Sequence, residues 1–248
     1  MFSNKTVVVT GAGRGIGRAL ALGFAAQGAA VLVHYGQAQQ SAEDVVRQIE
    51  INGGKAVSVQ ADVTVMSDVV RLVSEATTKL GPIDVWINNA GASANSAETQ
   101  GLSEEEILER VLAVDVMGTW RCCNAVKEHM RDGGCILNLG WDHALDGAPG
   151  FVNSMYAMSK GAVISLTRCL AQELAPRVRV NCIAPGWVEN EWAQSRSVSF
   201  RKRVEQGIPM GRWGTADDIV EAALFLASPA ASFITGQVLV VDGGEVMR

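Results

Sequence analysis

The stretch VVVTGAGRGIG, from Val7 to Gly17, decides the fold. Its apolar run ends at Thr10, and the glycines that follow allow a tight turn in which backbone N–H groups can approach an anion. A helix-like segment comes next, and the N-terminus of a helix favours a phosphate through its unpaired donors and its dipole. A strand, a glycine turn and a helix in this order predict a dinucleotide-binding unit.

Short apolar runs alternate with segments of helical periodicity along the rest of the chain. Strands that are apolar on both faces are typical of a parallel sheet covered by helices. We expect strands at 6–10, 30–35, 56–60, 85–88, 135–139, 179–183 and 238–241, and helices at 18–27, 43–52, 69–79, 104–130, 155–174 and 216–226. The sequence thus predicts one α/β domain over residues 1–248, a doubly wound, Rossmann-like parallel sheet of about seven strands.

The composition excludes several other classes of protein. A net charge of -5 with a pI near 5.3 gives no basic face for a nucleic acid. The five cysteines are scattered without CxxC spacing, so we expect reduced thiols in the core and no metal site. The strand-like run begins within a few residues of Met1, and no apolar stretch is long enough to span a membrane, so we expect a cytoplasmic protein.

The region from Trp187 to Trp213 is the one long irregular segment. It contains three tryptophans, Phe200 and the basic run RKR, and it lies between the sixth and seventh predicted strands. A segment there can close over the carboxyl ends of the strands, where parallel sheets bind their ligands. We expect a substrate lid at 187–213 that accepts a flat or apolar guest. A surface helical hairpin is the alternative.

The residues around the second strand favour NADP(H) over NAD(H). An NAD site usually has an acid at the end of that strand to bind the ribose hydroxyls, whereas the extra phosphate of NADP needs a nearby cation. Here the strand ends in His34 and Tyr35, with no acid, and Arg14 in the glycine turn supplies a fixed positive charge. His34 could add a donor, or it could be a half-buried strand residue.

Tyr156 and Lys160 form the motif YAMSK and project from the same face of one predicted helix. A phenol is a poor acid at neutral pH, but a nearby ammonium stabilises its phenolate. Such a pair can donate a proton to a carbonyl oxygen as hydride arrives.

In these motifs the chain resembles the short-chain dehydrogenase/reductase family from Thr6 to Gly244. Gly11, Gly15 and Gly17 fit the family pattern TGxxxGxG, and the segments ADV, NNAG, YAMSK and APG follow in the family's order. The C-terminal third resembles that of 3-oxoacyl carrier-protein reductases. The resemblance implies that these residues contact the cofactor: Gly11, Gly13, Arg14, Gly15, Ile16, Gly17, His34, Tyr35, Asp62, Val63, Asn89, Ala90, Gly91, Tyr156, Lys160, Pro185, Gly186, Val188 and Asn190.

Two positions depart from the family's usual catalytic tetrad. Asp115 stands where an asparagine is expected, and as a carboxylate it should pair with Lys160 and weaken the pull of that ammonium on Tyr156. Trp141 stands where a serine is expected, followed by Asp142 and His143. The indole, the carboxyl and the imidazole are all open as replacements. We favour Asp142, because pteridine reductases in the same family carry an Asp at the serine position.

The resemblance implies an NADPH-dependent enzyme that transfers hydride to a small carbonyl substrate, in the manner of 3-oxoacyl reductases. The expected catalytic residues are Tyr156, Lys160, Asp142 and Asp115. Two alternatives stay open: reduction of a C=N bond in a heterocycle, and a dinucleotide-binding protein with little or no turnover. The family also implies a homo-oligomer, a dimer or a tetramer.

Overall fold

Seven parallel strands form the centre of the molecule. The computed structural model describes residues 1–92, 94 and 99–247, and it confirms the α/β class and the seven-stranded sheet. The strand order is β3-β2-β1-β4-β5-β6-β7, so the chain moves outward in one direction from β1 and in the other direction from β4. The strands are β1 Thr6–Val9, β2 Ala30–Tyr35, β3 Lys55–Gln60, β4 Ile83–Asn88, β5 Met130–Leu139, β6 Val178–Pro185 and β7 Val238–Val241.

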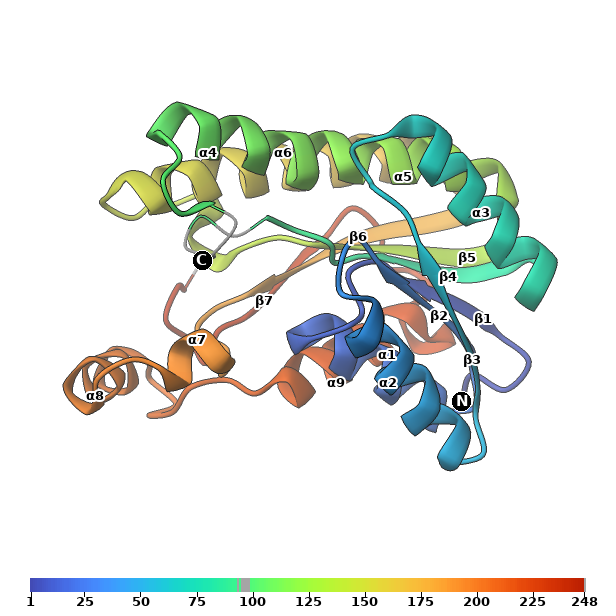
Figure 1. The fold of residues 1–248 in the computed structure, drawn as a ribbon, viewed down its shortest axis with the longest axis horizontal. Coiled ribbons are helices and arrows are strands. Elements are labelled where there is room, and N and C mark those ends of the chain that lie inside the picture. Colours follow the sequence, from blue (N-terminus) through green and yellow to red (C-terminus); the bar gives the residue numbers. More distant parts are fainter. Residues whose placement is uncertain (93, 95–98, 248) are drawn as a thin grey trace.

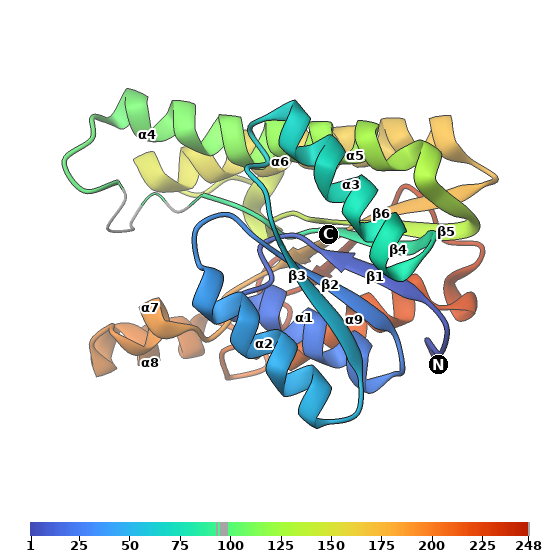
Figure 2. The same ribbon diagram turned by 45° about the vertical axis from the view of Figure 1, so that its right-hand side comes forward.

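Helices cover both faces of the sheet. In Figures 1 and 2, α3, α4, α5 and α6 lie on one side, and α1, α2 and α9 lie on the other. The main helices are α1 Gly15–Ala26, α2 Gln39–Ile51, α3 Met66–Leu80, α4 Glu104–Val111, α5 Thr119–Val126, α6 Phe151–Leu174 and α9 Ala216–Ala227. The direction of the chain reverses between β1 and β4, and sheets of this kind bind ligands at the carboxyl ends of the strands beside such a reversal.

The alternation of side chains along β1 builds two cores. Val7 and Val9 pack with Phe24 of α1 and Ile219 of α9, whereas Val8 packs with residues of α3 and α5 on the opposite face. All three valines are fully buried, because successive side chains of a strand point to opposite faces. This packing explains why the strands are apolar throughout.

Two predicted regions differ from the structure. The segment predicted as one helix at 104–130 contains a π-helical turn, Leu112–Gly118, and its last residue begins β5. The segment at 187–213 contains two helices, α7 Glu191–Gln194 and α8 Val198–Gly207, which lie together at one end of the molecule in Figure 1. The second region is thus more regular than expected, and a lid and a helical hairpin both stay open.

Four of the five free cysteines are buried, as expected, and Cys169 is exposed. Within the described residues, no helix has both the length and the apolar character needed to cross a bilayer.

Candidate active site

The glycine turn between β1 and α1 is packed tightly against the loop after β4. A Cβ on Gly17 would lie 2.3 Å from the Gly11 oxygen and 2.4 Å from Asn89 Nδ2. The Asn89 amide donates to the carbonyls of Thr10 and Gly11, at 2.9 and 3.0 Å. Gly15 has φ +55° with open space beyond it. The turn therefore presents bare backbone at the start of α1, as a phosphate site requires.

His34 has both ring nitrogens in contact with backbone groups of the protein. It is 2% exposed, its Nδ1 accepts a hydrogen bond from the Gly11 N–H, and its Nε2 lies 3.0 Å from the Ala61 oxygen. Burial lowers the pKa of His34 to about 4, so the ring is neutral and both nitrogens are engaged within the protein. His34 thus holds the glycine turn in place. Arg14 is exposed in the same turn, and contact of either residue with a cofactor stays a prediction.

Two pairs of residues predicted to contact the cofactor follow the carboxyl ends of β3 and β4. Val63 is buried, and Asp62 is exposed, with its Oδ1 accepting from the N–H and the hydroxyl of Thr64. The backbone N–H groups of Asn89 and Ala90 donate to the Thr10 hydroxyl. The fold thus brings these segments to the same edge of the sheet as the glycine turn, and their contacts with a cofactor stay predictions.

Tyr156 and Lys160 lie on α6 beside Asp115. The Lys160 ammonium is 2.9 Å from Asp115 Oδ2, and Asp115 Oδ1 accepts a hydrogen bond of 2.7 Å from the Ala92 N–H. The Tyr156 hydroxyl donates to the Ala92 oxygen at 3.3 Å. Burial opposes the charge on Lys160, but Asp115 outweighs it and the pKa of Lys160 is raised. Asp115 itself is 1% exposed and lies on the π-helical turn, a distortion common at functional sites.

Of the three candidates for the serine position, Trp141 lies next to Tyr156. Their ring centroids are 6.2 Å apart, and the Trp141 ring also meets the His143 ring edge-on at 5.4 Å. Asp142 is 1% exposed. Its Oδ1 accepts from the His143 N–H, and its Oδ2 would lie 3.0 Å from a Cβ on Gly186. These contacts favour Trp141 over Asp142, against the sequence-based preference.

Burial raises the pKa of Asp142 to about 6, although the hydrogen bond and the charge of His143 oppose it, and the charges of Glu245 and Asp242 add smaller raising effects. The carboxyl therefore lies among acidic groups from the end of the chain. Nothing in the sequence near Asp142 indicates these neighbours, because they follow it by about a hundred positions.

The segment after β6 shapes the far side of the site. A Cβ on Gly186 would lie 2.6 Å from the Asp242 Cβ, so the backbone at Pro185 and Gly186 is held close to the end of β7. Val188 forms a parallel bridge to Gly214. Asn190 caps α7, its side-chain oxygen accepting from the Ala193 N–H. Contacts of these residues with a nicotinamide stay predictions.

The tryptophans of the 187–213 segment pack against one another. Trp187 stacks on Trp192 with centroids 6.2 Å apart, and it meets Trp213 edge-on at 5.4 Å. Phe200 packs edge-on against both Trp187 and Trp192. The rings thus form a small core of their own, which does not support the expectation that they stack on a flat guest. A lid function of the segment stays a prediction.

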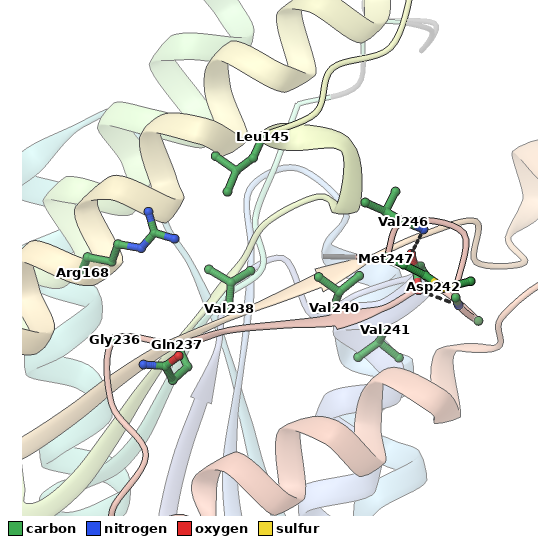
Figure 3. Close-up of a pocket in the computed structure, with 12 residues that line it drawn as sticks. Leu145, Arg168, Gly236, Gln237, Val238, Val240, Val241, Asp242, Val246 and Met247 are labelled. Atoms are coloured by element: carbon green, nitrogen blue, oxygen red, sulfur yellow. Dashed lines mark hydrogen bonds between the residues drawn. The ribbon is translucent and has the colours of Figure 1, made fainter.

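A hollow of about 810 Å³ runs along β7 and is lined by residues that include Leu145, Arg168 and Asp242 (Figure 3). Neither Tyr156 nor Lys160 lines it. We therefore place the candidate active site beside α6, where Tyr156 and Lys160 lie, and not in this hollow.

Known proteins resemble this chain over almost its whole length. A family model described as enoyl-(acyl carrier protein) reductase matches residues 11–245. The chain is 39% identical to 3beta-hydroxysteroid dehydrogenase 1 of Eggerthella lenta, over 98% of this chain and 94% of that protein. It is 37% identical to the 3-oxoacyl-[acyl-carrier-protein] reductase of Synechocystis sp., over 98% and 97%. A solved short chain dehydrogenase of Burkholderia cenocepacia in complex with NADP has a TM-score of 0.88 and 31% identity, covering 98% of each chain. The chain belongs to the short-chain dehydrogenase/reductase family.

As a short-chain dehydrogenase/reductase, the protein is an oxidoreductase similar to the 3-oxoacyl-acyl carrier protein reductases, and its cofactor is a nicotinamide dinucleotide. The glycine turn fits such a group, because α1 begins with open backbone at Gly15 and no side chain caps its first turn. At the two positions where the sequence predicts a departure from the family's usual tetrad, this short-chain dehydrogenase/reductase has Asp115 and Trp141.

Proposed function

We propose that the protein is an NADP(H)-dependent reductase that transfers hydride to the carbonyl of a small-molecule substrate, in the manner of a 3-oxoacyl reductase. The observation that carries the proposal is the group formed by Tyr156, Lys160 and Asp115, in which the buried ammonium lies 2.9 Å from the carboxylate. Arg14 in the glycine turn and the absence of an acid at the end of β2 support NADP(H). The NADP complex of a similar dehydrogenase supports it further.

When bound, the nicotinamide supplies the hydride. Tyr156 then gives its hydroxyl proton to the carbonyl oxygen of the substrate, and the positive charge of Lys160 stabilises the phenolate that remains. Asp115 forms an ion pair with Lys160 and holds Ala92, whose carbonyl accepts from the Tyr156 hydroxyl. The carboxylate thus orients the pair and also reduces the field of the ammonium at the phenol.

Trp141 takes the part of the missing serine in this proposal. Its ring lies beside Tyr156, and no acceptor among the described residues binds its indole N–H. An indole N–H is a donor only, so it can hold a carbonyl oxygen in place but cannot take part in proton transfer. The alternative, reduction of a C=N bond, rests on Asp142, Asp115 and the aromatic segment 187–213, and it stays a second candidate for the test below.

The test is NADPH oxidation by the wild type and by Tyr156→Phe, measured with ketones, aldehydes, 3-oxoacyl thioesters and dihydropterins. We expect a carbonyl substrate to be reduced, and we expect the variant to lose about a hundredfold or more of the rate while still binding NADPH. Tyr35→Phe is a matched control, because it removes the hydroxyl of the only other tyrosine. We expect Tyr35→Phe to change the KM for NADPH and to leave kcat unchanged.

Equal rates for the wild type and Tyr156→Phe would contradict the proposal and favour a dinucleotide-binding protein without turnover. Turnover of dihydropterins alone would favour the C=N reductase. Assembly into dimers or tetramers and location in the cytoplasm remain predictions, and sedimentation of the purified protein measures the first.

A further inference from the structure

Three possible metal ligands meet where the loop after β5 touches the segment after β7. They are Asp142, His143 and Glu245, and one ligand atom from each lies within 4.8 Å of the other two. Asp142 is buried, and the other two are partly buried. Only the fold brings them together, because Glu245 follows β7 and lies about a hundred positions after Asp142 and His143.

Glu245 is held in a position that leaves one of its oxygens unused. Its Oε1 accepts a hydrogen bond of 3.2 Å from the Trp187 indole N–H and lies 3.8 Å from His143 Nε2. Its Oε2 is out of contact with solvent and has no hydrogen-bond partner in the described part of the chain. A buried carboxylate oxygen without a partner is costly, so a group that binds this oxygen would stabilise the arrangement.

The carboxyl groups around the three residues would also favour a bound cation. The side chain of Asp242 is fixed nearby, since its oxygens accept from the backbone N–H groups of Gly244 and Val246 (Figure 3). Asp142 and Glu245 add two further carboxyls within reach of one another. Among the ion pairs between described residues, the partner of Glu245 is His143, which is charged only when protonated.

The donor set selects the class of metal. One imidazole nitrogen with two carboxylate oxygens suits zinc and similar transition metals, whereas magnesium and calcium prefer oxygen ligands alone. Zinc takes these donors at about 2.0–2.2 Å, which places the ligand atoms about 3.3 Å from one another in a tetrahedron. The three side chains need to close by roughly an ångström or more to reach this geometry.

We propose that Asp142, His143 and Glu245 bind one zinc-class divalent cation, with a water molecule as the fourth ligand. Hydrogen bonds to the proposed ligands fit this role, because metal ligands are usually oriented by hydrogen bonds from neighbouring groups. The Trp187 indole N–H orients Glu245, and the His143 backbone N–H orients Asp142. The expectation of no metal site considered only the cysteines, whereas this site has no cysteine ligand.

The cation would join the active-site loop to the segment after β7. The His143 ring lies against Trp141, and Trp141 lies against Tyr156. A fixed His143 therefore restricts the ring that faces the catalytic tyrosine. The site contributes to the position of Trp141 and does not take part in the hydride or proton transfer.

Binding is measured by calorimetric titration of zinc chloride into chelator-treated protein at neutral pH, with magnesium chloride as the comparison. Cys169→Ser is the background variant, because an exposed thiol can bind zinc by itself. We expect one saturable zinc site per chain of micromolar affinity or tighter, a higher melting temperature with zinc, and no saturable response to magnesium.

Glu245→Gln and His143→Asn are expected to weaken zinc binding by at least about tenfold each. His129→Gln is the matched control, since His129 is an exposed histidine outside the cluster, and it should leave the affinity unchanged. The melting temperature without metal and the binding of NADPH show whether each variant is folded. Absence of saturable zinc binding to the wild type overturns the proposal. So does zinc binding that survives both cluster substitutions, or that is lost in His129→Gln.

Discussion

Asp115 is the residue at which this protein departs most clearly from the family's usual chemistry. Its carboxylate is buried, it forms an ion pair with Lys160, and it binds the backbone N–H of Ala92. An asparagine in its place would keep an acceptor for Ala92 but would carry no charge. The substitution therefore separates the orienting role of this position from its electrostatic role.

Asp115→Asn should shift the pH dependence of catalysis downward by roughly one unit. Without the carboxylate, the Lys160 ammonium acts more strongly on Tyr156 and favours its phenolate. Carbonyl reduction needs the protonated phenol, so its rate should begin to fall at a lower pH, and the reverse oxidation should rise at a lower pH. The profile of kcat/KM against pH measures both. Asp84→Asn removes another buried aspartate, which binds Lys5, and should leave the profile in place.

Arg14 carries the predicted choice of cofactor. It is exposed at the start of α1, and hydrogen bonds to charged groups contribute about 1.5–3 kcal/mol. Arg14→Ala should therefore raise the Kd for NADPH by about ten- to a hundredfold and change that for NADH little. Fluorescence titration with both cofactors measures this. Arg18→Ala is the matched control, because Arg18 lies on the same helix and binds Gln48. An equal loss of affinity for NADPH and NADH in Arg14→Ala would contradict the assignment.

At the scale of the elements, the approach of α1 to the loop after β4 depends on Gly17. Gly17→Ala would place a methyl group 2.3 Å from the Gly11 oxygen, which neither backbone can accommodate without moving. We expect the variant to lose most of its affinity for the dinucleotide and to melt at a lower temperature.

Gly207→Ala is the control for this substitution. Nothing lies within 4 Å of a Cβ at Gly207, and its φ is not positive, so the added methyl group should be tolerated. Calorimetry and NADPH titration compare the two variants. Unchanged NADPH affinity in Gly17→Ala would show that the turn is not the binding site.

The elements also show how far the sequence predicts the structure. The strand 30–35 was predicted with its observed bounds, because an apolar run between turns is a local signal. The strand 130–139 was predicted only from Cys135, since residues 131–134 are charged or glycine and lie next to an irregularity in the pairing with β4. A π-helical turn keeps the helical pattern of apolar residues, so the sequence at 112–118 resembles an ordinary helix.

Some contacts of the candidate site could also be predicted from the sequence, and others could not. The ion pair of Lys160 with Asp115 was predicted, because the family order of motifs fixes both positions. The surroundings of Asp142 could not be predicted, because Glu245 and Asp242 reach it only through the folded sheet. The engagement of His34 with Gly11 and Ala61 was missed for the same reason, since both partners are backbone groups that carry no signal in the sequence.

At the scale of the whole molecule, His34 makes stability depend on pH. The pKa of His34 is about 4 in the folded protein and near 6.5 in the unfolded chain, so the unfolded chain binds more protons between these values. The free energy of unfolding should therefore fall as the pH drops from 6.5 towards 4, and this one group should remove roughly 3 kcal/mol across the window.

Denaturant titrations of the wild type and His34→Gln at several pH values measure this contribution. Other groups titrate in both proteins, so the difference between the two curves isolates the histidine. We expect the wild type to lose more stability than the variant on acidification. Curves that stay parallel from pH 6.5 to 4 would contradict the buried neutral ring.

The strand order has a consequence for the order of assembly during synthesis. The neighbours β3, β2, β1 and β4 all lie within the first 88 residues, and Asp84 binds the Thr6 N–H across that distance. A nascent chain emerging from the ribosome can thus pair four strands around the glycine turn before α6 has been translated. The part of the molecule expected to bind the nucleotide would therefore form before the part that contains Tyr156 and Lys160.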